Sequence, residues 1–288
     1  MIRDMHDGDM KAVVAMLQRG VQWRALEIAA ILKSATVFLY EQQGEIVACG
    51  MYDATSFGEE GTAEIYVYTC PEWRNQGIGS SLFDQLFRQL EQQEKRVTAV
   101  AATYRVDEGE AEAFFAGRGF VPLWGQHLMQ YSGGMLAAPT LAIKPFADGD
   151  LQRYIQSQSD AYYEVRKGID LKPYRLTDYS EQTMESWKKW LLTEMKDDIH
   201  MFYDEAGAFV GSLIVTPHGE AYDVFVDPLH QGKGYGKQLA AFFVNRTLEK
   251  GLQPYLLTGT HNKPAIALYE RTGFQICQTM LTARRPLS

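Results

Sequence analysis

Two short glycine-rich segments are the strongest candidates for a chemical role in this chain. One reads Arg74, Asn75, Gln76, Gly77, Ile78, Gly79, Ser80, and the other reads Gln231, Gly232, Lys233, Gly234, Tyr235, Gly236, Lys237. Each follows an apolar, strand-like run that ends near a proline, and each precedes an apolar run with helical spacing. Glycine lets the backbone turn tightly and leaves its N–H groups uncovered. Because the following helix starts with a partly positive end, each segment is predicted to cradle a phosphate or pyrophosphate.

Other glycine-rich phosphate motifs fit these segments poorly. A Walker loop closes with Gly-Lys-Ser/Thr, and neither segment does so. Gly232, Gly234 and Gly236 lie too close together for a dinucleotide-binding fingerprint. A glycine turn with a purely structural role is the remaining alternative.

The elements that position these segments occur twice. Residues 2–9 resemble residues 143–150, and each glycine segment is followed by a helical run that ends in Gly-Phe, at Gly119 and Gly273. Each half reads as a helix, a hairpin, a strand, the glycine segment, a helix, a strand, a second helix and a last strand. This order predicts an α/β (α+β) domain present twice. The linker around Met135 divides the 288 residues into predicted domains 1–135 and 136–288.

Composition restricts the class of protein. The apolar share of 46% and the charged share of 22% are typical of a soluble globular protein. No apolar run is long enough to span a bilayer, and no secretory stretch opens the chain, so a cytoplasmic protein without a membrane partner is expected. A net charge of −8 argues against nucleic acid as a partner. Three separated cysteines and isolated histidines predict no metal site.

The two glycine segments resemble the acetyl-CoA-binding signature of the GNAT superfamily of N-acetyltransferases. The segment from Asn262 to Phe274 is similar to the downstream motif of the same family. The resemblance covers nearly the whole chain, once in each half. It implies two tandem domains, each with a mixed, mostly antiparallel central sheet flanked by helices. It also implies acetyl-CoA as the acyl-donor substrate and direct transfer, in a ternary complex, to a primary amine of a small molecule or peptide.

The resemblance also assigns site residues. It implies that the strand before the second glycine segment, around Phe225 and Val226, pairs its backbone with the pantetheine arm. Tyr269 stands where the family places its general acid, and a phenol is protonated at neutral pH. Asn262 stands where the family holds pantetheine or its bound water. A tyrosine that only packs against the cofactor, and an exposed loop asparagine, are the alternatives for these two residues.

The general base is predicted from the strand that leads to the second glycine segment. Asp223 interrupts an apolar alternation there, and a carboxylate is costly to bury without a purpose or partner. It is the first candidate, and Glu220 is the second. A carboxylate that serves only as a structural hydrogen-bond acceptor is the alternative.

The first copy departs from the family pattern. Alignment of the Gly-Phe pairs places Phe115 where the second copy has Tyr269, and Glu108 where it has Asn262. Phe115 has no proton to donate, so the C-terminal half is predicted to carry catalysis. Glu64 and Tyr66 offer the first copy another arrangement. The aromatic stretch between residues 162 and 190 is either a packed helical hairpin or a wall of the acceptor pocket.

Two other functions remain open beside the N-acetyltransferase. One is a two-domain acyltransferase that acts on a larger amine, like the mycothiol synthases. The other is a non-catalytic acyl-CoA sensor or interaction protein, which would tolerate loss of Tyr269 and Asn262. The sequence names neither the acceptor nor the oligomeric state.

Overall fold

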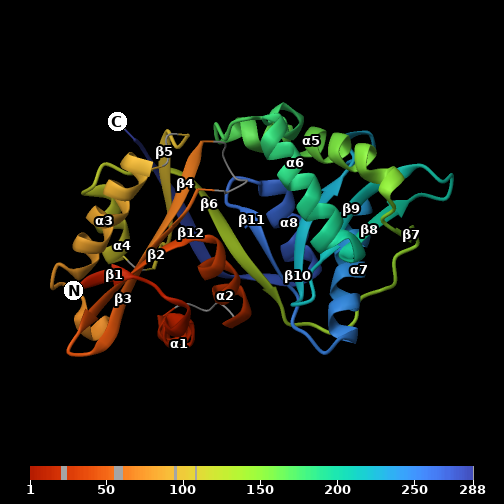
Figure 1. The fold of residues 1–288 in the computed structure, drawn as a ribbon. Helices are drawn as coiled ribbons and strands as arrows, with labels where there is room; N and C mark the ends of the chain where they lie inside the picture. Colours follow the sequence, from red (N-terminus) through yellow and green to blue (C-terminus); the bar gives the residue numbers. More distant parts are fainter. Residues whose placement is uncertain (21–24, 55–60, 94–95, 108, 288) are drawn as a thin grey trace. The chain divides into compact units, whose positions relative to one another are not determined.

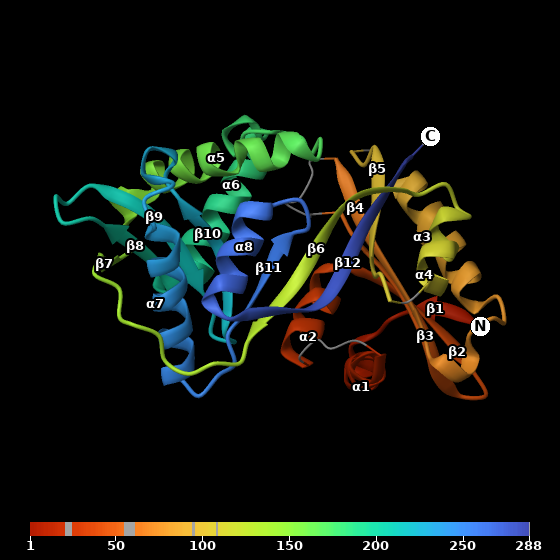
Figure 2. The ribbon, with the colours of Figure 1, turned by 180° about the vertical axis from the view of Figure 1, so that it is seen from behind.

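The computed structural model divides the chain into two compact units (Figures 1 and 2). It describes residues 1–20, 25–54, 61–93, 96–107 and 109–287. Unit 1 comprises Met1–Tyr104, Glu110–Pro122 and Thr282–Ser288, and unit 2 comprises Arg105–Gly109 and Leu123–Leu281. The units therefore interleave along the chain. The boundary near residue 135, which concerns the two sequence copies, stays a prediction.

Unit 1 has a mostly antiparallel sheet with helices on both faces. Its strands run in the order β1 (Ile2–Asp4), β2 (Thr36–Gln42), β3 (Glu45–Asp53), β4 (Thr62–Thr69) and β5 (Ala99–Arg105), and the last part of β12 (Phe274–Pro286) lies beside β5. From β1 to β5, all neighbours are antiparallel except β4 and β5. Helices α1 (Met10–Gly20) and α2 (Ala25–Ser34) pack on the face that carries Leu39 and Cys49. Helices α3 (Ile78–Gln93) and α4 (Gly109–Ala116) lie on the opposite face, where Gly50 approaches Leu86.

Unit 2 repeats this plan. Its strands run in the order β6 (Val121–Tyr131), β11 (Tyr255–Gly259), β10 (Glu220–Val226), β9 (Phe209–Val215), β8 (Ile199–Tyr203) and β7 (Ala142–Pro145). The first part of β12 (Phe274–Pro286) lies beside β6, on the side away from β11. Only β10 and β11 pair in parallel among the described ladders of this unit. Helices α7 (Tyr235–Glu249) and α8 (Lys263–Thr272) cover one face (Figure 2). Helices α5 (Leu151–Gly168) and α6 (Glu181–Trp190) cover the other (Figure 1).

Strand alternation explains the two layers of unit 2. On β8, Phe202 faces the core cluster that α7 and α8 share, whereas Met201 and Tyr203 face the cluster beneath α5 and α6. Successive side chains of a strand point to opposite faces, so one strand supplies both cores. The predicted α/β class, with a mixed, mostly antiparallel sheet and flanking helices in each copy, is confirmed.

Part of the aromatic stretch between residues 162 and 190 lies on two helices. Helix α5 runs to Gly168 and carries Tyr162 and Tyr163. Trp187 and Trp190 lie on α6, whose first turn is capped by the Ser180 hydroxyl, which accepts from the N–H of Thr183 at 3.3 Å. Among the described residues, no helix is both long and apolar enough to cross a membrane.

Candidate active site

The two glycine segments share one backbone conformation. Asn75 and Gly232 occupy equivalent positions with φ of 60° and 75°, and Gly77 and Gly234 follow with φ of 78° and 83°. This left-handed region favours glycine and tolerates asparagine, which explains the residue types at both positions. The equivalence shows that the sequence repeat is also a structural repeat.

Matching hydrogen bonds hold both segments to the preceding strand. The Arg74 Nε donates to the carbonyl of Thr69 at 3.2 Å, and the Gln231 Nε2 donates to the carbonyl of Val226 at 3.0 Å. These two side chains therefore attach each glycine segment to the strand that precedes it. In unit 1, the Ser80 hydroxyl accepts from the guanidinium of Arg118 at 2.6 Å.

Unit 2 leaves room for an anion above its glycine segment. A Cβ on Gly232 or Gly234 would meet nothing within 4 Å, so the space beside both residues is open. Helix α7 begins at Tyr235, and the first N–H groups of a helix have no partner within it. Gly236 has a different role, because a Cβ there would lie 3.0 Å from the Leu268 side chain. The third glycine thus allows α7 to pack closely against α8.

Strands β10 and β11 separate just before this segment. Their parallel ladder joins Glu220 to Tyr255 and Ala221 to Leu256, and no later pair follows on these described strands. The β4–β5 ladder of unit 1 ends at the equivalent pair, Ile65 and Ala102. Both units therefore open a gap between their two parallel strands at the same point of the fold.

The open edge of β10 exposes backbone groups of alternate residues. The Asp227 N–H donates to Val210 on β9 at 2.8 Å, and Phe225 is in register with Ser212 of the same strand. Val226 therefore directs its N–H and carbonyl groups toward the gap, because backbone groups alternate along a regular strand. Of the two residues predicted to pair with pantetheine, Val226 has its backbone on the open edge. The backbone of Phe225 faces β9, and its side chain is buried. Their pairing with the donor stays a prediction.

A β-bulge distinguishes β10 from its counterpart in unit 1. The register with β9 shifts between Tyr222 and Phe225, and Asp223 within the bulge has a φ of 54°. The β3–β4 ladder runs from Ala48–Thr69 to Asp53–Glu64 without such a shift. A bulge re-aims a side chain, and here the re-aimed side chain is the predicted base.

Asp223 is held by two side chains of α5. Its Oδ2 accepts from the Tyr154 hydroxyl at 2.9 Å and from the Gln158 amide. Burial raises the pKa of the Asp223 carboxyl to about 6, against the opposing effect of the bonds from Gln158 and Tyr154. The carboxylate is consequently ionised in most molecules at neutral pH and able to take up a proton near it.

Tyr269 lies on α8 with a phenol that stays protonated. Its side chain is buried, and its ring contacts Phe274 with centroids 5.7 Å apart. Burial raises its pKa to about 12. Tyr162, on α5, reaches the strand that carries Asp223, because its hydroxyl donates to the carbonyl of Val224 at 3.1 Å. The roles of Tyr269 as acid and of Asp223 as base stay predictions.

Asn262 has a clear structural task. Its Oδ1 accepts from the Ala265 N–H at 3.3 Å and caps the first turn of α8. An asparagine side chain also carries an NH₂ group, which this cap does not use. Its predicted contact with the pantetheine arm stays a prediction.

In unit 1, an apolar ring stands in place of the Tyr269 phenol. Phe115 is buried among aromatic rings and contacts Phe120 at 5.3 Å, which matches the contact of Tyr269 with Phe274. Tyr66 donates to Glu64 at 2.8 Å, and burial raises the pKa of the Tyr66 phenol. Glu108 lies outside the described residues.

The residues of α5 that hold β10 were not among the predicted site residues. Besides Tyr154 and Gln158, the Tyr162 hydroxyl donates to the carbonyl of Val224 at 3.1 Å, and Ser157 donates to Asp227 at 2.7 Å. The signal was available, because residues 154, 158 and 162 recur every four positions and carry polar tips on one helical face.

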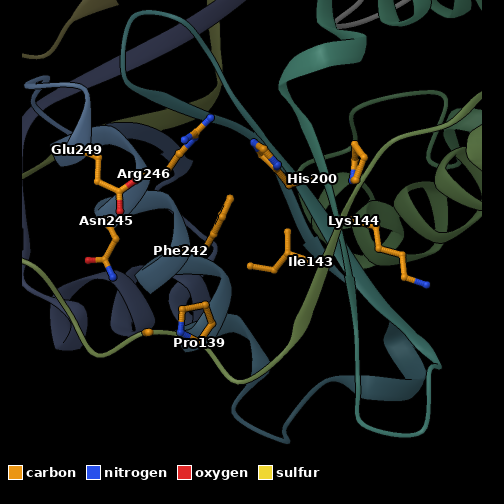
Figure 3. Close-up of a pocket in the computed structure, with 10 residues that line it drawn as sticks. Pro139, Ile143, Lys144, His200, Phe242, Asn245, Arg246 and Glu249 are labelled. Atoms are coloured by element: carbon orange, nitrogen blue, oxygen red, sulfur yellow. The ribbon is translucent and has the colours of Figure 1, made fainter.

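Unit 2 also has a hollow that is separate from the glycine segment. It has a volume of 560 Å³ and lies between β7, β8 and the second half of α7, with His200, Phe242 and Arg246 on its wall (Figure 3). Burial, together with nearby Arg246, lowers the pKa of His200 to about 4, so this histidine is neutral. None of the predicted site residues lines this hollow.

Each of the two copies matches a known protein family. A model described as Acetyltransferase (GNAT) domain matches residues 33–122, and a model described as Acetyltransferase (GNAT) family matches residues 161–274. The chain belongs to the GNAT acetyltransferase family. It carries two GNAT domains in tandem, as the glycine segments predicted. GNAT acetyltransferases take an acetyl group from acetyl-CoA and pass it to an amine, and this chain is such an N-acetyltransferase.

Similar proteins cover most of the chain. A mycothiol acetyltransferase of Thermobifida fusca is 27% identical over 270 residues, which make up 83% of this chain and 78% of that protein. A GCN5-related N-acetyltransferase of Sphaerobacter thermophilus has a similar structure, with a TM-score of 0.74, 16% identity and coverage of 99% and 95% of the two chains. A tandem GNAT protein from the clavulanic acid biosynthesis pathway gives a TM-score of 0.69, 13% identity and coverage of 99% and 98%. The two structural likenesses concern the fold.

Proposed function

We propose that unit 2 transfers the acetyl group of acetyl-CoA directly to a primary amine of a small molecule or peptide. The observation that carries the proposal is the bulge of β10, which turns Asp223 toward α5 beside the point where β10 and β11 separate. A buried carboxylate on β10 and a protonated phenol on α8 would supply the two proton steps of amine acylation.

The donor would lie along α7 and the open edge of β10. The N–H groups at Gly234, Tyr235 and Gly236 suit a pyrophosphate, because they are at a helix N-terminus with open space beside Gly234. The backbone N–H of Val226 suits a carbonyl of an amide-bearing arm that lies along the open edge. The carbonyls of Val224 and Val226 already accept from Tyr162 and Gln231. Lys233 and Lys237 add positive charge to this region.

The two proton steps fall to separate side chains. Acetyl-CoA supplies an activated thioester. The amine nitrogen attacks its carbonyl carbon, and the carbon–nitrogen bond forms as the carbon–sulfur bond breaks. Asp223 takes the proton that the attacking amine must lose, directly or through water, and Glu220 is the second candidate for this role. Tyr269 gives its proton to the departing sulfur and regains one from solvent.

Unit 1 is proposed to play a supporting part. It has the same glycine-segment geometry, but it lacks the bulge, and Phe115 stands at the position of the acid. Its contribution would be stability, geometry or a second donor site. A non-catalytic sensor is a weaker hypothesis for the whole chain, because a sensor has no use for a protonated phenol on α8 and a buried carboxylate on β10.

The acceptor of a mycothiol acetyltransferase is a specific second candidate for the substrate. Sequence similarity over 83% of the chain to proteins of that name favours it. It would make the acceptor a larger amine, in line with the two-domain synthase that the sequence left open.

A product screen tests the proposal. Purified protein is mixed with acetyl-CoA and a panel of amines that includes the mycothiol acetyltransferase acceptor, and products are identified by mass spectrometry. We expect one amine to gain an acetyl group, with loss of the product in Tyr269→Phe. Binding of acetyl-CoA without any acetylated product would support the sensor instead.

A further inference from the structure

Helix α5 makes four side-chain hydrogen bonds to one continuous stretch of β10 and the turn after it. Tyr154 and Gln158 donate to Asp223, Tyr162 donates to the carbonyl of Val224, and Ser157 donates to Asp227. Three of these donors are spaced four residues apart and lie on one face of the helix. The stretch that they hold begins at the bulge and ends at the cap of the turn that leads into the glycine segment.

Burial of Gln158 points to a task other than packing. The side chain is 2% exposed, and its Oε1 is buried without a hydrogen-bond partner among the described residues. A buried oxygen that lacks a partner is unfavourable, and an apolar side chain of similar size would fill the same space without it. The N–H that Gln158 donates to Asp223 is therefore the feature that the amide provides.

Tyr154 combines both tasks. Its ring is fully buried between Phe146 and Phe225, with centroid distances of 5.8 and 5.3 Å. Its hydroxyl donates to the same Oδ2 of Asp223 that accepts from Gln158. Both donors favour the ionised carboxylate, because a donated hydrogen bond stabilises the negative charge.

We propose that α5 is a positioning helix of the active site, in which Tyr154 and Gln158 fix the orientation of Asp223 and stabilise its negative charge through two donated hydrogen bonds. Ser157 and Tyr162 extend the same attachment to the donor-binding side of β10. The proposal rests on the proposed function, since it gives a role to the proposed base. Tyr154 and Gln158 act through Asp223 and are not themselves proton carriers.

The charged surroundings of Asp223 are simple. The titratable groups that sense its charge are the phenols of Tyr154 and Tyr162 on α5 and of Tyr222 on β10. Burial raises the pKa of each phenol, so all three stay neutral over the working range. Among the described residues, no cationic side chain hydrogen-bonds to Asp223. The two α5 donors are therefore the groups that offset its burial.

The test follows the titration of Asp223 in the unliganded protein. Carbon-13 NMR of aspartate-labelled full-length chain gives the carboxyl midpoint, which is assigned with Asp223→Asn. We expect Tyr154→Phe and Gln158→Met each to raise the midpoint by about one pH unit, the usual size for loss of a donor to a charged acceptor. Ser157→Ala is the control, because it removes a bond of α5 to Asp227 and leaves both partners of Asp223. Its midpoint should match that of the wild type.

Turnover gives a second readout of the same proposal. If the midpoint rises from about 6 to about 7, kcat/KM falls roughly fivefold at pH 6 and returns close to the wild-type value at pH 8. Folded variants with an unchanged midpoint, or with an equal loss at every pH, would overturn the proposal. A shifted midpoint in a protein that acetylates no amine would instead refute the proposed function and leave the positioning role standing.

Discussion

At the scale of single residues, burial shifts the pKa of both proposed proton carriers in the same direction, and the shift suits two different roles. Burial disfavours the charged form of each group. It therefore raises the pKa of Asp223 to about 6, where a base works well, and that of Tyr269 to about 12, where an acid keeps its proton. The difference between the two residues comes from their chemistry and from the two donors that reach Asp223.

Replacement of Tyr269 by phenylalanine tests the acid. The ring contact with Phe274 is kept and only the hydroxyl is lost, so the fold and acetyl-CoA affinity should change little. We expect kcat to fall by roughly 10²-fold, the low end for general acid catalysis. Steady-state kinetics and calorimetry give the two values. Phe115→Tyr is the matched change in unit 1 and should leave kcat unaltered. If Tyr269→Phe kept full kcat, Tyr269 would have only a packing role.

Asp223 should also make stability depend on pH. Its carboxyl has a higher pKa in the folded protein than the usual 3.8, so its contribution is most favourable below about pH 4 and is lost as pH rises through about 6. Asp223→Asn carries no charge and escapes this loss. We expect the variant to gain on the order of 2 kcal/mol over the wild type between pH 4 and pH 7. Urea unfolding at both pH values measures the difference, and a gap that does not vary with pH would contradict the assignment.

At the scale of elements, the glycine segments and the strands around them show which features the two copies share. Both have a left-handed residue at the second position, a left-handed glycine at the fourth and a side chain that returns to the strand carbonyl. They differ on the strand itself, where β10 has a bulge and β4 has a regular ladder. The geometry of the glycine segment is thus present twice, and the re-aimed carboxylate is present in unit 2.

A matched pair of glycine substitutions tests the division of labour. Gly77 and Gly234 have similar φ, and a Cβ at either would meet nothing within 4 Å, so Gly77→Ala and Gly234→Ala carry similar backbone strain. We expect turnover to collapse with Gly234→Ala and largely to survive Gly77→Ala. Gly79 and Gly236 make a poorer pair, because only Gly236 is tight against Leu268. Steady-state kinetics on the folded variants measure the turnover of each. The reverse pattern would assign catalysis to unit 1. Equal losses in both variants would indicate two cooperating sites.

At the scale of the whole molecule, each compact unit includes a segment that belongs to the other sequence copy. Residues 282–288 belong to unit 1, where Thr282 contacts Thr103 at 2.9 Å and the Leu287 N–H donates to Thr98 at 2.9 Å. Most of β6 belongs to unit 2, where it pairs with β11 from Gln126 to Gln130. Neither sequence copy therefore contains every strand of one compact unit.

Removal of residues 282–288 should weaken unit 1 rather than the copy in which they lie. Their loss uncovers β5 and removes the stacking of Arg285 on Phe87. We expect amides of β5 to exchange with solvent at least tenfold faster, since an uncovered edge strand opens more readily. Peptides from β9 and β10 serve as the internal control and should keep their protection. Faster exchange in unit 2, with β5 unchanged, would mean that these residues stabilise the other unit.

The sequence determined the class of fold, the duplication, the two glycine segments, and Tyr269 with its unequal counterpart Phe115. These features are local: glycine and proline types, helical spacing and a repeated order can all be read along the chain. The tertiary structure decided the rest. Only the fold reveals that Asp223 lies in a bulge, that Tyr154 and Gln158 of α5 reach it from about seventy residues away, and that the last residues of the chain complete unit 1. Strand register and helix-to-strand contacts depend on packing between distant segments, and no periodicity within one segment encodes them.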